Sequence, residues 1–125
     1  MKRWIGRSIM GVSVGHTLFA VAVFNQQLTS IVQRGFFNTI GDAKTGLAVW
    51  FVLFGAILCL LGMAVDTLEQ RSADPMPKSL GWGVLALTAV GVCLMPASGF
   101  WLVFPAAIAM LVRKSPAPAV AAARA

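Results

Sequence analysis

Charged residues are scarce in this sequence of 125 residues. Asp, Glu, Lys and Arg together make up 11% of the chain, whereas hydrophobic residues make up 58%. A soluble domain usually carries about a quarter of its residues as charged side chains. The shortage excludes an ordinary globular protein and predicts an integral membrane protein. The length leaves room for one domain of spanning helices and for no separate soluble module.

Residue types that support catalysis or metal binding are also few. The chain has two cysteines, one histidine and four acidic residues. Cys59 and Cys93 lie in separate apolar runs without a CxxC pair, which gives thiol redox chemistry little support. One imidazole and two distant thiols do not form a metal ligand set. We therefore predict no metal site and no catalytic residue, and we favour a protein that is not an enzyme.

The positive charge does not point to nucleic acid. Ten Lys and Arg residues give a formal net charge of +6, but they are scattered at the ends of the expected helices and form no stripe or motif. Their placement is better explained by membrane topology. The lipid bilayer is the expected partner, and nucleic acid is not.

Four apolar stretches predict four membrane-spanning helices, over residues 4–24, 46–66, 80–95 and 97–112. The first has roughly 30 Å of helical length, which matches the hydrocarbon core of a bilayer. The last two are shorter, about 24 Å each, and Pro105 should kink the final helix. We expect an all-α, four-transmembrane-helix bundle over residues 1–114, followed by a flexible Ala/Pro tail over 115–125.

An amphipathic segment is expected between the first and second spanning helices. Leu28, Ile31, Val32, Gly35 and Phe36 follow the spacing of one helical face. This pattern predicts a helix lying in the membrane interface. After the second span, Asp66 should end the helix, and residues 67–79 should form a polar, proline-broken loop.

The basic residues also predict an orientation. Four spans would place the N-terminus, the 67–79 loop and the C-terminus on one side. Eight basic residues lie on that side, and only Arg34 and Lys44 lie on the other. The excess predicts a multi-pass membrane protein with both termini in the cytoplasm.

His16 is the leading candidate for a functional residue, because an ionisable group at mid-membrane is costly and usually faces the bundle interior. Equal distances along the expected helices bring residues of all four helices to its level. They predict a pocket on the outward side for a hydrophobic or lipid-like small molecule, with Phe36 or Phe37 as its lid. The expected lining is His16, Phe54, Cys93, Ser98 and Trp101.

Three other interpretations of His16 stay open. The commonest would be a structural histidine, hydrogen-bonded to a carbonyl or hydroxyl of a neighbouring helix. A haem- or quinone-binding protein or enzyme would use the imidazole directly. A small dimeric transporter would need a membrane-embedded carboxylate, but Asp66 should lie at the cytoplasmic surface. There we expect it to pair with Arg3 and Arg7 and to hold the first two helices together.

Glycines are spaced for close helix packing. Gly11 and Gly15 form a small-xxx-small pair in the first span, and Gly55 and Gly62 lie seven residues apart in the second. Such glycines let helix backbones approach closely in lipid. They predict packing inside the bundle or across a homodimer.

Several short motifs along the chain resemble a family of small bacterial four-helix integral membrane proteins of unknown function. The resemblance covers nearly the whole chain short of the tail. It implies a four-span inner-membrane protein, and it supplies no activity, substrate or cofactor. The motifs are Trp4-Ile-Gly-Arg, Gly15-His-Thr, Gly35-Phe-Phe-Asn, Trp50-Phe, Gly62, Leu80-Gly-Trp and Met95-Pro-Ala-Ser-Gly-Phe-Trp-Leu.

Overall fold

The computed structural model describes residues 4–71 and 76–113, and in these ranges the secondary structure is entirely helical. The predicted all-α class is confirmed. The predicted tail over 115–125 and Arg3 lie outside the described residues. The helices, in chain order, are α1 (Ile5–Val23), α2 (Asn25–Gln33), α3 (Ala43–Gln70), α4 (Lys78–Leu94), the 3₁₀ helix η1 (Gly99–Val103) and α5 (Phe104–Val112).

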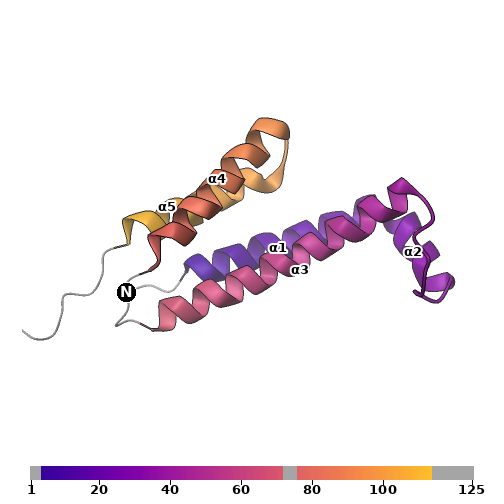
Figure 1. Cartoon of the computed structure of the whole chain (residues 1–125), viewed down its shortest axis with the longest axis horizontal. Coiled ribbons are helices and arrows are strands. Elements are labelled where there is room, and N and C mark those ends of the chain that lie inside the picture. Colours follow the sequence, from indigo (N-terminus) through magenta and orange to yellow (C-terminus); the bar gives the residue numbers. More distant parts are fainter. Residues whose placement is uncertain (1–3, 72–75, 114–125) are drawn as a thin grey trace, which may run out of the picture.

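The helices form two antiparallel pairs (Figure 1). In the first pair, α1 packs along α3, and α2 crosses the far end of both. In the second pair, η1 and α5 lie antiparallel to α4, and together the three helices form a hairpin. The closest backbone approaches between the pairs are those of α5 and η1 to α1, whereas the backbones of α3 and α4 stay farther apart within the described ranges. The hairpin diverges from the α1–α3 pair toward its tip (Figure 1).

Two of the described helices, α1 and α3, are long and apolar enough to cross a membrane. Only 28% of the apolar window of α1 and 22% of that of α3 is buried inside the protein. A core helix of a soluble protein would be mostly covered, so this exposed apolar surface indicates membrane association.

Four spans of full length are not present. The α4 helix has 17 residues, about 26 Å at helical rise. A complete span needs about 20. The second arm of the hairpin, Gly99–Val112, is also shorter than a complete span. The expected bundle of four spans is therefore corrected to two long helices and a shorter hairpin.

Helix α3 is longer at both ends than the predicted 46–66. At its start the Asp42 carboxylate caps the helix, accepting hydrogen bonds from the Thr45 backbone N–H at 2.9 Å and the Thr45 hydroxyl at 2.6 Å. These bonds hold the pKa of Asp42 below its ordinary value. At its end the helix continues past Asp66 to Gln70. The interpretation of residues 67–70 as loop was wrong.

The segment expected to be amphipathic forms α2, with Phe24 as the only residue between it and α1. The chain then turns through three residues in the left-handed region, with φ of 84° at Gly35, 66° at Phe36 and 52° at Asn38. This turn brings the chain back to the start of α3.

Pro105 does not kink a helix. The predicted fourth helix is divided into η1 and α5, and Pro105 lies in the first turn of α5. A proline is tolerated there because the missing N–H would have no intrahelical acceptor.

The tightest contact between α1 and α3 is made by Gly6 and Gly62. A Cβ atom on Gly6 would lie 2.6 Å from the Gly62 carbonyl oxygen, and one on Gly62 would lie 2.9 Å from the backbone nitrogen of Met10. By contrast, a Cβ on Gly11 or Gly15 would meet nothing within 4 Å. The small-xxx-small pair of α1 therefore faces away from this interface.

We predict opposite effects for two alanine substitutions in α1. Gly6→Ala should destabilise the fold by about 1–3 kcal/mol, because the new methyl group meets α3 backbone. Gly11→Ala should be neutral or stabilising by up to about 1 kcal/mol, because alanine is the better helix former. Reversible unfolding of both variants in mixed micelles would measure this. Equal effects would contradict the described helix pairing.

Candidate functional site

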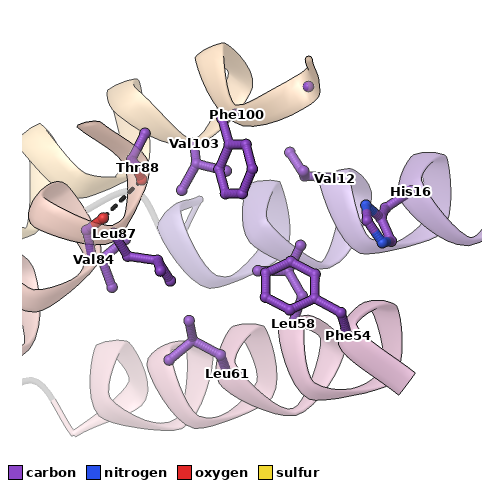
Figure 2. Close-up of a pocket in the computed structure, with 11 residues that line it drawn as sticks. Val12, His16, Phe54, Leu58, Leu61, Val84, Leu87, Thr88, Phe100 and Val103 are labelled. Atoms are coloured by element: carbon purple, nitrogen blue, oxygen red, sulfur yellow. Dashed lines mark hydrogen bonds between the residues drawn. The ribbon is translucent and has the colours of Figure 1, made fainter. Parts of the chain in front are cut away.

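An apolar cavity lies between the α1–α3 pair and the α4–α5 hairpin (Figure 2). Its volume is about 50 Å³, and it is partly open to the surface. This space takes a narrow group such as a segment of an alkyl chain, and it is well below the roughly 300–1,000 Å³ of sites that enclose a whole drug-sized molecule. Four helices supply the lining, which is almost entirely apolar: Val12, His16, Phe54, Leu58, Leu61, Val84, Leu87, Thr88, Gly99, Phe100 and Val103.

Helix α3 fixes the position of His16. The imidazole Nε2 lies 3.0 Å from the Phe51 carbonyl oxygen, and the ring stacks on the Phe51 ring with centroids 4.2 Å apart. Gly55 leaves room for the ring, since a Cβ there would lie 3.2 Å from the His16 Cδ2. One turn earlier, Ser13 donates its hydroxyl to the Gly55 carbonyl at 2.7 Å. His16 is therefore held in one orientation.

The hairpin closes the other side of the cavity. The Phe100 ring lies 6.4 Å from the Phe54 ring, centroid to centroid, and rests over Gly91 of α4. Thr88 is almost fully buried, and its hydroxyl donates to the Val84 carbonyl at 2.7 Å. The hydroxyl proton of Thr88 is thus already used. The other polar side chain of the lining is His16, whose second ring nitrogen has no hydrogen-bond partner among the described residues.

Two of the five predicted pocket residues, His16 and Phe54, line this cavity. The other three do not. Cys93 is exposed. Ser98 caps η1 by accepting the Phe100 N–H at 3.5 Å. Trp101 is 55% exposed and donates its indole N–H to the Pro96 carbonyl at 2.8 Å. Residues from the centre of the hairpin replace them, because α4 and η1 turn other faces toward α1.

Neither expected lid residue covers the cavity. Phe36 lines a second apolar groove beneath α2, which also includes Leu28, Ile31, Ile40 and Leu53. Phe37 is 91% exposed. The reason is that α2 lies over the α1 and α3 ends, away from the hairpin (Figure 1).

No catalytic or metal constellation accompanies the cavity. Within residues 4–71 and 76–113, no three His, Cys, Asp or Glu side chains come close enough together to hold a metal ion. The arrangement can enclose an apolar body and offer its polar end one ring nitrogen.

Charged residues gather at the end of α1 and α3 away from α2. Arg7 Nε lies 3.8 Å from Asp66 Oδ1, and the Arg7 side chain is 69% exposed. The third residue expected in this ion pair, Arg3, lies outside the described residues.

Glu69 is the residue that sequence reasoning missed. It is 3% exposed, and its carboxylate accepts the backbone N–H of Gly6 at 2.9 Å and pairs with Arg113. The prediction treated residues 67–79 as loop and so left Glu69 in solvent. A signal was present, because Glu69 continues at helical spacing the buried stripe that includes Gly62 and Val65.

Comparison with known proteins gives a family and no activity. The sequence model of the family of unknown function DUF6463 matches residues 1–117. Among curated proteins, polyol transporter 5 of Arabidopsis thaliana is 24% identical over 106 residues, which cover 78% of this chain and 17% of the transporter. The chain therefore spans about a sixth of that relative. No solved structure matches.

We predict that the two ion pairs differ sharply in their contribution to stability. Arg113→Met should cost about 3–5 kcal/mol, because it leaves the buried Glu69 carboxylate without its cation. The control, Arg7→Met, removes a pair that is long at 3.8 Å and whose cation is 69% exposed, and it should cost less than about 1 kcal/mol. Unfolding of both variants in one detergent mixture would test this. Similar losses would show that Glu69 is not held as described.

Proposed function

Because the chain belongs to DUF6463, a family without an assigned activity, we propose its function from the cavity. The protein is an integral membrane protein that holds a hydrophobic or lipid-like molecule between the α1–α3 pair and the α4–α5 hairpin. It works by binding and has no catalytic step. The polar end of the molecule lies against His16.

The observation that carries this proposal is an apolar cavity with one oriented polar group. Apolar walls stabilise a hydrocarbon body by excluding water, and a few fixed polar groups set its orientation. His16 is held by Phe51 at a known position, so it can act as such a group. Residues of both α3 and α4 line the cavity, although their backbones stay apart, and we place a lateral route of entry from the bilayer between these two helices.

A transporter is the second candidate, favoured by the similarity to polyol transporter 5. The cavity argues against a polyol as cargo. A polyol carries many hydroxyl groups, and each one buried without a partner costs free energy. Apart from His16 and the already bonded Thr88, the lining has no polar side chains. A hydrophobic cargo fits these walls better.

We also propose the placement of the chain in the bacterial inner membrane. The α4–α5 hairpin lies in the same membrane as α1 and α3, giving four crossings of unequal length. Both termini face the cytoplasm. Support comes from the basic residues, because among those in residues 4–71 and 76–113 only Arg34 and Lys44 lie near the α2 end. Exposed Trp50 and Trp101 suit an interface at that end, and exposed Trp4 and Trp82 suit one at the other.

The ligand proposal predicts different results for two matched variants of α1. Val12 lines the cavity, whereas Val14 is 59% exposed and faces away from it. Val12→Phe should fill the space and remove a copurifying hydrophobic molecule, and Val14→Phe should retain it. Native mass spectrometry of the three proteins, released gently from detergent, would show the bound mass. If wild type carries no added mass, even after incubation with membrane lipid extract, the proposal fails.

The topology predicts a labelling pattern for single cysteines. With Cys59 and Cys93 replaced by serine, Gln26→Cys in α2 and Ala97→Cys at the hairpin tip should react with an impermeant maleimide added to spheroplasts. Lys78→Cys at the start of α4 should react only after the membrane is opened. The reverse pattern would overturn the orientation. Protection of Ala97→Cys alone would show that the hairpin enters the membrane without crossing it.

A further inference from the structure

We propose that the cavity selects molecules whose polar end carries a hydroxyl group, and that His16 Nδ1 is the atom that makes this selection. The ligand class is a long-chain alcohol or phenol, including a hydroquinone. Ethers, esters and oxidised quinones, which offer only acceptors, are disfavoured. This inference rests on the proposed function, because it assigns the polar end of the molecule bound in that cavity.

The tautomer of His16 follows from its partner. A backbone carbonyl can only accept a hydrogen bond, so the Nε2 that lies 3.0 Å from the Phe51 oxygen carries the hydrogen. In a neutral imidazole the other nitrogen is then a bare acceptor. His16 therefore presents Nδ1 as an acceptor.

The free nitrogen faces away from α3. The Cδ2 edge of the ring is turned to Gly55, where a Cβ would lie 3.2 Å away, and Nε2 is turned to Phe51. Nδ1 lies on the opposite edge of the ring from Cδ2. In Figure 2 the ring stands at one end of the cavity, with Val12 and Phe54 as its neighbours there. A polar group that enters the cavity would meet this edge.

No described side chain occupies Nδ1. The nearby hydroxyl of Thr17 donates to the Ser13 carbonyl at 3.0 Å, and that of Thr88 donates to the Val84 carbonyl. In the part of the chain that the structure describes, the hydrogen bond to Phe51 is the only one His16 makes. An acceptor in an apolar wall gains most from a ligand that brings a donor, and a ligand with a second acceptor leaves both unpaired.

A pair of isomers tests this selection. Tridecanol and dodecyl methyl ether contain the same atoms, but only the alcohol has a donor. We expect wild type to bind the alcohol about fivefold more tightly, which corresponds to roughly 1 kcal/mol for one net hydrogen bond. Because the isomers have the same mass, native mass spectrometry of separate samples, each with one compound at the same bilayer concentration, would give the ratio. The His16→Phe variant keeps a ring on Phe51 and should bind the two isomers equally.

The outcomes separate this inference from the proposed function. Equal binding of both isomers to wild type would overturn the selection while the cavity stands as a ligand site. Preference for the ether would overturn it too, because the hydroxyl hydrogen of the alcohol would then find no acceptor at Nδ1. A different result would overturn the proposed function itself. In that case neither isomer binds to wild type, and another lipid copurifies with both wild type and Val12→Phe, so the cavity is not the binding site. The wild-type comparison holds even if His16→Phe fails to fold.

A second measurement reads the nitrogen directly. His16 is the only histidine in the chain, so ¹⁵N spectra of protein purified without a histidine tag report one imidazole. Nε2 should be protonated and Nδ1 bare, and tridecanol should shift the Nδ1 resonance more than its ether isomer does. A protonated Nδ1 in the wild-type protein would contradict the inference.

Discussion

The buried carboxylate of Glu69 is the interaction on which the arrangement of helices depends. It lies near the end of α3, accepts a backbone N–H at the start of α1 and pairs with Arg113 at the end of α5. Each contact matches the charge of a helix end, because N-termini favour anions and C-termini favour cations. One side chain thus joins three helix ends. Without its partners, the buried charge would cost several kcal/mol, about 3–5 by analogy with other broken pairs.

This fixed point explains why a cavity forms. The hairpin is joined to the α1–α3 pair near Glu69, and its closest backbone approaches to that pair are those of α5 and η1 to α1. Because the backbones of α3 and α4 stay farther apart, the space between them widens away from the joint. The rings of Phe54 and Phe100 extend into this space from opposite sides and fill part of it. The remainder is the apolar cavity that ends at His16.

A sequence of rings links this cavity to the other end of the molecule. Phe24 lies 5.6 Å from Phe51, Phe51 stacks on His16 at 4.2 Å, and Phe54 lies 5.4 Å from His16, all measured between centroids. Aromatic pairs at these distances contribute roughly 0.5–1.5 kcal/mol each beyond their buried area. His16 therefore has a structural role as well as the binding role that we propose. The two are compatible because they use different edges and faces of one ring.

The composition of each segment was enough to predict the helical class, the membrane association and the amphipathic helix of this protein. The shortage of charge and the long apolar runs specified helices and a membrane environment, and the spacing of Leu28 and Ile31 specified an amphipathic helix between α1 and α3. His16 stood out as the ionisable residue in the middle of α1. Equal distances along the expected helices placed Phe54 at the same level, and the two rings lie close together. These features depend on neighbours in the chain, so the sequence alone could indicate them.

Only the tertiary structure decided the remaining features. Whether Glu69 lies in solvent or in a buried pair depends on Arg113, which is 44 residues away and belongs to another helix. The rotation of each helix about its axis decides which residues face a neighbour. It places Gly6 and not Gly11 against α3, and Phe100 and not Trp101 in the cavity wall. Apolar residues surround these helices on nearly every side, so periodicity does not reveal which side faces protein. Packing between helices supplied that choice.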